Sequence, residues 1–189
     1  MMRRTALFAS LPNMITLGRL VLVPLIVVMI ASSRWREAFL VFLLAGVSDA
    51  VDGFLAKRFD LRTELGSYLD PLADKALLVS IYVTLAVRDV LPPWIAILVV
   101  SRDLMIVGAI IVSWLLARPV AIRPLAVSKL NTAAQIAFAA FVLAAKAFDW
   151  PLEDGFRFAL YLVAALTVAS AGAYFTQWFV HMQRESSRP

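Results

Sequence analysis

The sequence predicts an all-α integral membrane protein with six transmembrane helices. Its 189 residues are 62% hydrophobic and only 16% charged, and the mean hydropathy is +0.84. Such a composition is typical of membrane proteins and argues against an ordinary soluble domain. A bilayer core of about 30 Å takes about 20 helical residues, and the chain has six apolar segments of about this length. We expect residues 1–189 to form one transmembrane domain.

The six helices are expected over 12–31, 37–57, 67–87, 92–116, 125–146 and 156–180. Basic residues sit at the ends of the first three, and the first is too long for the usual 7–15 residue core of a cleaved signal peptide. Pro92 and Pro93 begin the fourth, where proline is tolerated. Pro124 and Gly155 mark the loops before the fifth and sixth. Trp178 is expected near a helix end as an interfacial anchor, and the tail from Gln183 is expected to be disordered.

The distribution of basic residues predicts the orientation of the chain. Cytoplasmic loops of membrane proteins carry an excess of Lys and Arg. Ten of these residues fall on the side of the two termini, and five fall on the other side: Arg3, Arg4, Lys57, Arg58, Arg62, Arg118, Arg123, Lys129, Arg184 and Arg188, against Arg34, Arg36, Arg88, Lys146 and Arg157. We therefore expect cytoplasmic termini in a bacterial cytoplasmic membrane or an equivalent inner membrane.

The net charge of +5 does not indicate a nucleic-acid partner. The basic residues are not gathered in one tract but lie at the ends of apolar segments, where they suit anionic lipid head groups. We expect membrane lipids and no nucleic acid as partners. The chain has no cysteine, so it has no disulfide and no thiolate metal site, and the redox compartment stays open.

Four aspartates lie within 26 residues, between apolar flanks. Asp49 and Asp52 are three residues apart, and Asp70 and Asp74 are four apart, so each pair shares one helix face. Carboxylates near hydrocarbon are costly and repel one another. Together they offer oxygen ligands suited to Mg²⁺ or Mn²⁺. The alternative, a solvated acidic face, fits the apolar flanks poorly.

The same stretch carries a recognisable pattern. Residues Asp49 to Asp74 read D-x2-D-G-x2-A-K-x8-G-x3-D-x3-D. This pattern resembles the signature of the CDP-alcohol phosphatidyltransferases, which have Arg where this chain has Lys57. The resemblance extends over nearly the whole chain, from Pro12-Asn13 onward. It implies the six-helix fold of that family. The orientation expected from the basic residues places the 58–66 loop, and with it the aspartate cluster, on the cytoplasmic side.

The resemblance also implies an activity. The family transfers the phosphatidyl group of CDP-diacylglycerol to an alcohol and releases CMP, which makes its members phosphotransferases. By resemblance, Asp49, Asp52 and Asp70 bind two divalent cations, Mg²⁺ or Mn²⁺. Asp74 is implied as the catalytic base that takes the proton of the acceptor hydroxyl, and it is also counted among the metal ligands.

Several residues are candidates for binding CDP-diacylglycerol. Gly53 and Gly66 would permit close approach to the donor, although plain helix packing is the alternative. Lys57 and Arg58 are placed to meet its phosphates, and positive-inside topology explains them equally well. Lysine lacks the planar fork of arginine, so Arg58 could supply the contact in its place.

The start of the first helix offers two further donor candidates. Asn13 and Thr16 share one helical face with Arg19 by their spacing. Contact with the nucleotide is one reading of Asn13, and an N-cap role is the other.

Four basic residues are candidates for binding the acceptor: Arg102, Lys129, Arg118 and Arg123. Arg102 interrupts an apolar helix, and charges inside a membrane are functional by default. Its charge could instead be neutralised by Asp103, or the two residues could interact with Lys75 through the carboxylate of Asp103. His181, the only histidine, is expected to contact head groups.

The identity of the acceptor is left between two alcohols. The stretches 101–105 and 128–135 resemble the mitochondrial-type cardiolipin synthases, which use phosphatidylglycerol. Phosphatidylglycerophosphate synthases share the layout and use glycerol 3-phosphate. Residues 108–113 are uncharged, and a dianionic acceptor would want more fixed positive charge, so we favour phosphatidylglycerol.

An alternative function, of a class other than an enzyme, is that of a cation-binding membrane transporter, since acidic residues in a membrane helix can form ion sites. The glycine spacing and the single cluster at one face argue against it. A homodimer is implied by the resemblance alone.

Overall fold

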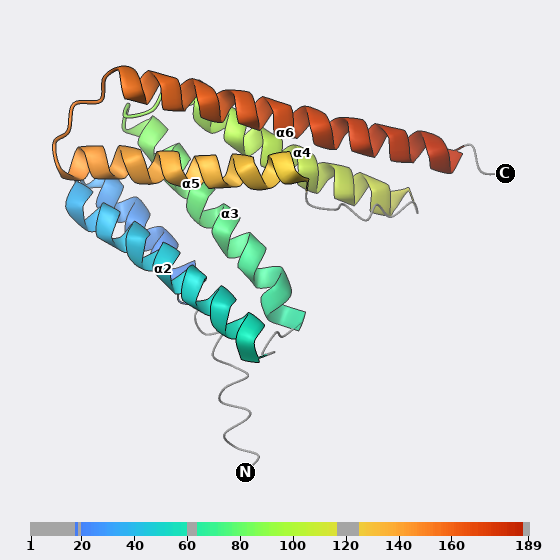
Figure 1. Cartoon of the computed structure of the whole chain (residues 1–189), viewed down its shortest axis with the longest axis horizontal. Helices are drawn as coiled ribbons and strands as arrows, with labels where there is room; N and C mark the ends of the chain where they lie inside the picture. Colours follow the sequence, from blue (N-terminus) through green and yellow to red (C-terminus); the bar gives the residue numbers. More distant parts are fainter. Residues whose placement is uncertain (1–17, 19, 60–63, 117–124, 187–189) are drawn as a thin grey trace, which may run out of the picture. The chain divides into compact units, whose positions relative to one another are not determined.

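The computed structural model describes residues 18, 20–59, 64–116 and 125–186 (Figure 1). The elements are a helical segment over Leu20–Ala31, followed by α2 Trp35–Phe59, α3 Glu64–Val87, α4 Pro93–Leu115, α5 Ala126–Ala147 and α6 Asp154–Ser186. Throughout this described part the regular structure is helical. The expected all-α class is therefore confirmed.

The boundaries of α2 to α5 and the start of α6 agree with the expected ones to within a few residues, and the end of α6 does not. The expected start of the first helix at residue 12 lies outside the described residues. Helix α6 continues to Ser186, so the expectation of disorder from Gln183 is wrong over residues 183–186. Trp178 consequently lies two turns inside the helix and not at its end. The expected end of this helix was taken from the end of its apolar run. Backbone hydrogen bonds can continue a helix through polar residues, so the helix extends beyond that run.

Three helices of the described chain are long and apolar enough to cross a membrane: Pro93–Leu115, Ala126–Ala147 and Gly155–Gln183. The apolar stretches Leu20–Ala31 and Lys75–Val87 are shorter as far as their described residues extend. Length and composition therefore agree with an integral membrane protein.

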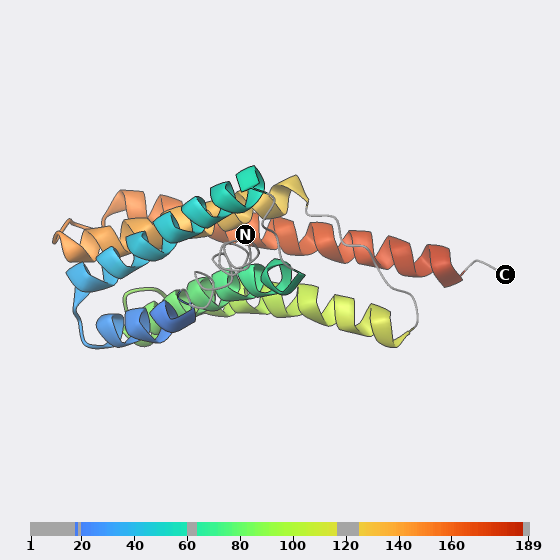
Figure 2. The ribbon, with the colours of Figure 1, turned by 90° about the horizontal axis from the view of Figure 1, so that it is seen from below.

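The chain divides into two compact units. The first comprises residues 1–90 and 139–151, and the second comprises 91–138 and 152–189. In the first unit, α2 and α3 run in opposite directions (Figure 2). The start of α2 meets the end of α5: Arg36 Nε donates to the carbonyl of Ala147 at 3.1 Å, and the rings of Phe39 and Phe148 lie edge to face with centroids 5.8 Å apart.

Three helix ends of the first unit close in the same way. Ser33, Asp89 and Asp149 follow the Leu20–Ala31 segment, α3 and α5, and each has a positive φ of 54–58°. The residue after each donates back into the helix, as Val90 N does to the Leu85 carbonyl at 2.9 Å. This left-handed turn caps the last carbonyls of a helix. Glycine usually supplies it, and here Ser and Asp do.

The second unit is built on α4 and α6, which run in the same direction (Figures 1 and 2). Buried residues of α4 and of α6 recur at alternating spacings of three and four: Ile95, Val99, Arg102 and Ile106, and Leu160, Val163, Thr167, Ser170 and Tyr174. This spacing places each set on one helix face. The face includes polar side chains because helices in lipid associate through small and hydroxyl residues.

Candidate functional site

The backbone of the first unit sets the register of the aspartate cluster. Asp49 and Asp52 lie on the second half of α2, and Asp70 and Asp74 lie on the first half of α3. Asp49 is ten residues before the end of α2, and Asp74 is ten residues after the start of α3. At about 1.5 Å per residue, both lie about 15 Å from the connection between the helices. The two carboxylate pairs are therefore at matching levels of two antiparallel helices.

The donor set fits a hard divalent cation. All four residues offer carboxylate oxygens, in two pairs that are each about one helical turn apart. Mg²⁺ and Mn²⁺ prefer such oxygen ligands to sulfur ligands. Of the four side chains, only that of Asp49 is among those described, and it is exposed. Within the described side chains no group of three acidic or histidine residues could hold an ion. Asp52, Asp70 and Asp74 lie outside that set.

The other expected donor residues also lie outside the described side chains. Gly53, Lys57 and Arg58 are helical positions of α2, and Gly66 is a helical position of α3. Gly53 follows Asp52 directly, and Lys57 lies four residues farther along α2. Asn13, Thr16, Arg118 and Arg123 lie outside the described residues altogether.

Arg102 is the best defined polar residue of the second unit. It is 5% exposed and all three nitrogens of its guanidinium donate. Nη1 donates to Asp103 Oδ1 at 2.5 Å, Nη2 to Ser170 Oγ at 2.8 Å and to Ser128 Oγ, and Nε to Ser170 Oγ at 3.2 Å. The guanidinium carbon also lies 5.6 Å from the centroid of the Tyr174 ring. Charge and hydrogen bonds together offset the cost of burying the cation.

Arg102 and Asp103 therefore form an ion pair, as one of the alternatives drawn from the sequence expected. The neighbouring carboxylate removes most of the local positive charge. The guanidinium carries five N–H groups, and the acceptor-binding role expected for Arg102 stays a prediction.

A second hydrogen-bonded group follows along the same face. Gln135 Nε2 donates to Thr167 Oγ1 at 3.2 Å, and Thr167 Oγ1 lies 2.9 Å from Asn131 Oδ1 and 2.7 Å from the carbonyl of Val163. Asn131 and Thr167 have no exposed surface, and Gln135 is 3% exposed. Asn131 Nδ2 is buried and has no hydrogen-bond partner among the described residues. A buried donor of this kind marks a place where a polar group or a water would be stabilised.

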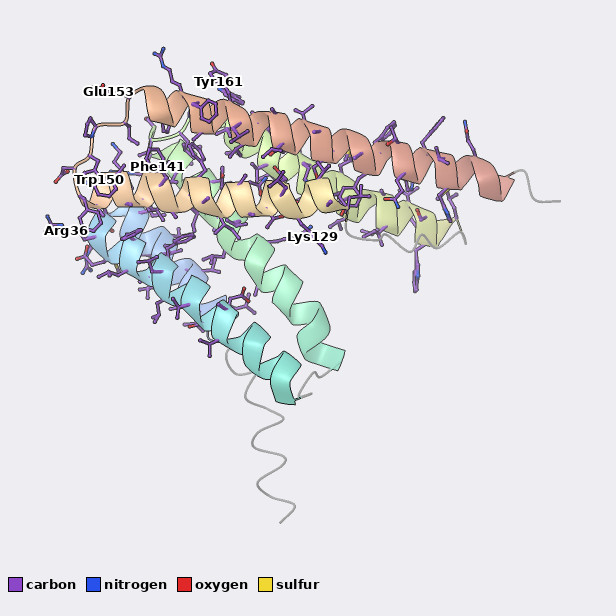
Figure 3. All side chains as sticks on the ribbon, in the orientation of Figure 1. Arg36, Lys129, Phe141, Trp150, Glu153 and Tyr161 are labelled. Atoms are coloured by element: carbon purple, nitrogen blue, oxygen red, sulfur yellow. The ribbon has the colours of Figure 1, made fainter. Side chains whose placement is uncertain are left out.

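Lys129 does not join these buried groups. It is exposed, and Figure 3 shows its side chain leaving α5 on the side away from α6. Arg102 and Lys129 thus belong to different faces of the second unit, one packed between helices and the other open.

Sequence reasoning missed Thr167, Ser170 and the partner of Trp178. Trp178 Nε1 donates to Ser113 Oγ at 2.8 Å, and Ser113 in turn donates to the carbonyl of Ala109 at 2.6 Å. A small apolar cavity of about 20 Å³ lies beside this bond, lined by Met105, Ala109 and neighbouring residues. Thr167 and Ser170 share the three-and-four spacing of the buried apolar residues of α6, and this spacing was the available signal.

Comparison with known proteins agrees with the sequence pattern. The sequence model of the family described as CDP-alcohol phosphatidyltransferase matches residues 9–178. The chain is 34% identical to "CDP-diacylglycerol--glycerol-3-phosphate 3-phosphatidyltransferase 1, chloroplastic" of Oryza sativa subsp. japonica, over 88% of this chain and 56% of that protein. It is 32% identical to "Cardiolipin synthase (CMP-forming)" of Homo sapiens, over 88% of this chain and 60% of that protein.

A bacterial relative matches over almost its whole length. The chain is 32% identical to "CDP-diacylglycerol--glycerol-3-phosphate 3-phosphatidyltransferase" of Bacillus subtilis (strain 168), over 89% of this chain and 94% of that protein. The chain thus spans a little over half of the plant and human relatives and nearly all of the bacterial one. From the aspartate register, the helical architecture and these matches, the chain belongs to the CDP-alcohol phosphatidyltransferase family.

Proposed function

We propose that this protein transfers the phosphatidyl group of CDP-diacylglycerol to phosphatidylglycerol, giving cardiolipin and CMP. The observation that carries the general reaction is the complete set of four aspartates at matching levels of α2 and α3. The relatives support it, because their printed names include both a CMP-forming synthase and phosphatidyltransferases that act from CDP-diacylglycerol.

In this reaction the acceptor oxygen attacks the phosphorus that bears the diacylglycerol, and the bond from that phosphorus to the CMP oxygen breaks. Two divalent cations, held by Asp49, Asp52 and Asp70, would neutralise the phosphates of the donor. Asp74 takes the proton of the acceptor hydroxyl, which is general base catalysis. Gly53 and Gly66 leave room for the donor, and Lys57 and Arg58 bind its phosphates.

The choice of acceptor rests on the charge along α4. Arg102 is paired with Asp103 and bonded to two serines. The rest of α4 has no further cation, and its last turn has no basic residue. Among the described residues near this segment, Lys129 supplies an exposed positive charge. This modest charge suits a phosphodiester with one negative charge better than glycerol 3-phosphate with about two.

A synthase that makes phosphatidylglycerophosphate is the second candidate. The bacterial relative covered over 94% of its length carries that printed activity. Arg118 and Arg123 could provide the additional positive charge. We infer that the active site faces the cytoplasm with both termini, from the ten-to-five distribution of basic residues, and that the protein acts as a homodimer, from the family resemblance.

A product assay tests this proposal. The purified protein receives CDP-diacylglycerol together with phosphatidylglycerol or with glycerol 3-phosphate, and CMP and lipid products are measured. We expect cardiolipin and CMP with the lipid acceptor and little CMP with glycerol 3-phosphate. Phosphatidylglycerophosphate without cardiolipin would assign the second candidate. Release of no CMP with either acceptor would contradict the proposed reaction and favour a cation-binding transporter.

A further inference from the structure

A groove at the N-terminal ends of α4 and α6 has no role in the proposed reaction. Its volume is about 840 Å³, within the range of about 300–1,000 Å³ found for small-molecule sites. Side chains of both helices and of the turn before α6 line it, among them Trp94, Glu153, Arg157 and Tyr161. All of these residues belong to the second unit.

Two aromatic rings form one part of the groove. Trp94 of α4 and Tyr161 of α6 stack with centroids 6.2 Å apart and planes 24° from parallel. Trp94 is 42% exposed and Tyr161 is 64% exposed, and Figure 3 shows Tyr161 projecting outward from α6. The faces of such rings attract cations. Tryptophan and tyrosine at the ends of membrane helices also lie at the depth of lipid head groups.

Two opposite charges form the other part. Glu153 precedes α6, and Arg157 lies one turn before Tyr161 on that helix; both are exposed. Neither forms a salt bridge with another residue of the described chain. Within the described side chains, the groove therefore presents a carboxylate and a guanidinium that have no ion-pair partner, beside two aromatic faces. This arrangement is complementary to a zwitterion.

We propose that this groove binds a phospholipid whose head group carries a phosphate and a primary amine. Arg157 binds the phosphate. The Glu153 carboxylate accepts hydrogen bonds from the ammonium, which also contacts the faces of Trp94 and Tyr161. A primary ammonium suits Glu153 better than a quaternary one, because it has N–H groups to donate.

The surface beyond the groove fits the acyl chains of such a lipid. Ile97, Leu104 and Ile111 are 64%, 65% and 53% exposed. They follow Trp94 along α4 at spacings of three and seven residues, so they form one apolar stripe on that helix. A lipid whose head group occupies the groove can lay its chains along this stripe. This continuity favours a lipid over a free phosphoamine.

Native mass spectrometry of the full chain in detergent tests the proposal. The probes are phosphatidylethanolamine, phosphatidylcholine, phosphatidic acid and free phosphoethanolamine. Wild type should bind phosphatidylethanolamine most tightly. Trp94→Leu, Glu153→Gln and Arg157→Gln should each weaken it by about three- to fivefold, as expected for exposed cation–π and ionic contacts. Glu153→Lys should reverse the preference in favour of phosphatidic acid.

Two controls separate the groove from general effects. Trp114→Leu removes an exposed tryptophan at the other end of α4, and Asp149→Asn removes an exposed carboxylate from the loop before Glu153. Both should leave the binding unchanged. Equal binding of the three lipids by wild type, equal losses in the controls, or equally tight binding of free phosphoethanolamine would each overturn the proposal. Because CMP release is not measured, the outcome is independent of the proposed reaction.

Discussion

The hydroxyl of Ser170 accepts hydrogen bonds from two nitrogens of Arg102, Nη2 at 2.8 Å and Nε at 3.2 Å. One residue of α6 thereby fixes the plane of a guanidinium on α4. Ser170→Ala should raise the KM for the acceptor by about tenfold, the scale of a lost bond to a charged group, and leave the KM for CDP-diacylglycerol unchanged. Steady-state kinetics with each substrate varied in turn measure both.

Thr176→Ala is the matched control for this variant. The Thr176 hydroxyl is exposed on the same helix and donates a hydrogen bond to the carbonyl of Ala173 at 2.9 Å. Its loss should change neither the KM for the acceptor nor the KM for CDP-diacylglycerol. An equal rise of both KM values in Ser170→Ala would mean that Arg102 only holds the helices together.

Removal of divalent cations should abolish CMP release. The aspartate pairs of α2 and α3 offer carboxylates and no neutral ligands, so their mutual repulsion needs a cation to offset it. We expect EDTA to stop turnover, and Mg²⁺ or Mn²⁺ added in excess to restore it. Undiminished CMP formation in thoroughly chelated buffer would contradict a role for metal ions.

Asp70→Asn and Asp74→Asn should both lose nearly all turnover but differ in metal binding. Asp70→Asn removes a charged ligand, so the Mg²⁺ concentration for half-maximal activity should rise. Asp74→Asn removes the base, which contributes about 10²–10⁴-fold, and should keep more of its metal and donor affinity. Titration with Mn²⁺ measured by electron paramagnetic resonance distinguishes the two. Near wild-type turnover in Asp74→Asn would assign the base elsewhere.

Position 57 tests the contact with the donor phosphates. Lys57→Arg restores the residue usual in the family and should be tolerated or mildly beneficial, because the charge stays and the bidentate fork is gained. Lys57→Ala should chiefly raise the KM for CDP-diacylglycerol. If Lys57→Ala leaves that KM unchanged and Arg58→Ala raises it, Arg58 binds the phosphates.

Thr167→Val should destabilise the second unit. The substitution keeps the shape but removes the hydroxyl that bonds to Gln135 and Asn131, and the loss of a buried hydrogen bond costs about 0.5–1.5 kcal/mol. The thermal midpoint of the purified protein in detergent should fall by several degrees. Thr167→Ser keeps the hydroxyl and should lose less. Equal losses in the two variants would attribute the effect to packing alone.

Much of the architecture could be predicted from the sequence, because bilayer thickness imposes a minimum length on each apolar helix. The bounds of α4, expected at 92–116 and found at 93–115, follow from this constraint and from Pro92 and Pro93. The four aspartates could be proposed as a site because they share the spacing of the family signature, and within each pair this spacing places both residues on one helix face; their role stays a prediction. These features depend on local sequence, so they can be predicted from a single sequence.

The contacts of the second unit could not be predicted in the same way. Serine and threonine are common in membrane helices, and their partners are set by which faces pack together. The sequence around Ser170 does not indicate its contact with Arg102, and the sequence around Trp178 does not indicate its contact with Ser113. The interfacial position expected for Trp178 stays a prediction. Its indole N–H bonds to Ser113, two residues before the end of α4, and the position of Trp178 near the end of the apolar run did not indicate this contact.

Helix α6 is longer than a membrane is thick. Its 33 residues span about 50 Å at 1.5 Å per residue, and even a tilt of about 40° leaves about 38 Å along the bilayer normal, against a hydrocarbon core of about 30 Å. Part of α6 must therefore lie outside the hydrocarbon core, in the head-group region that brings the bilayer to about 40–45 Å. A helix of this length can thus reach the head groups on both sides of a bilayer even when it is strongly tilted.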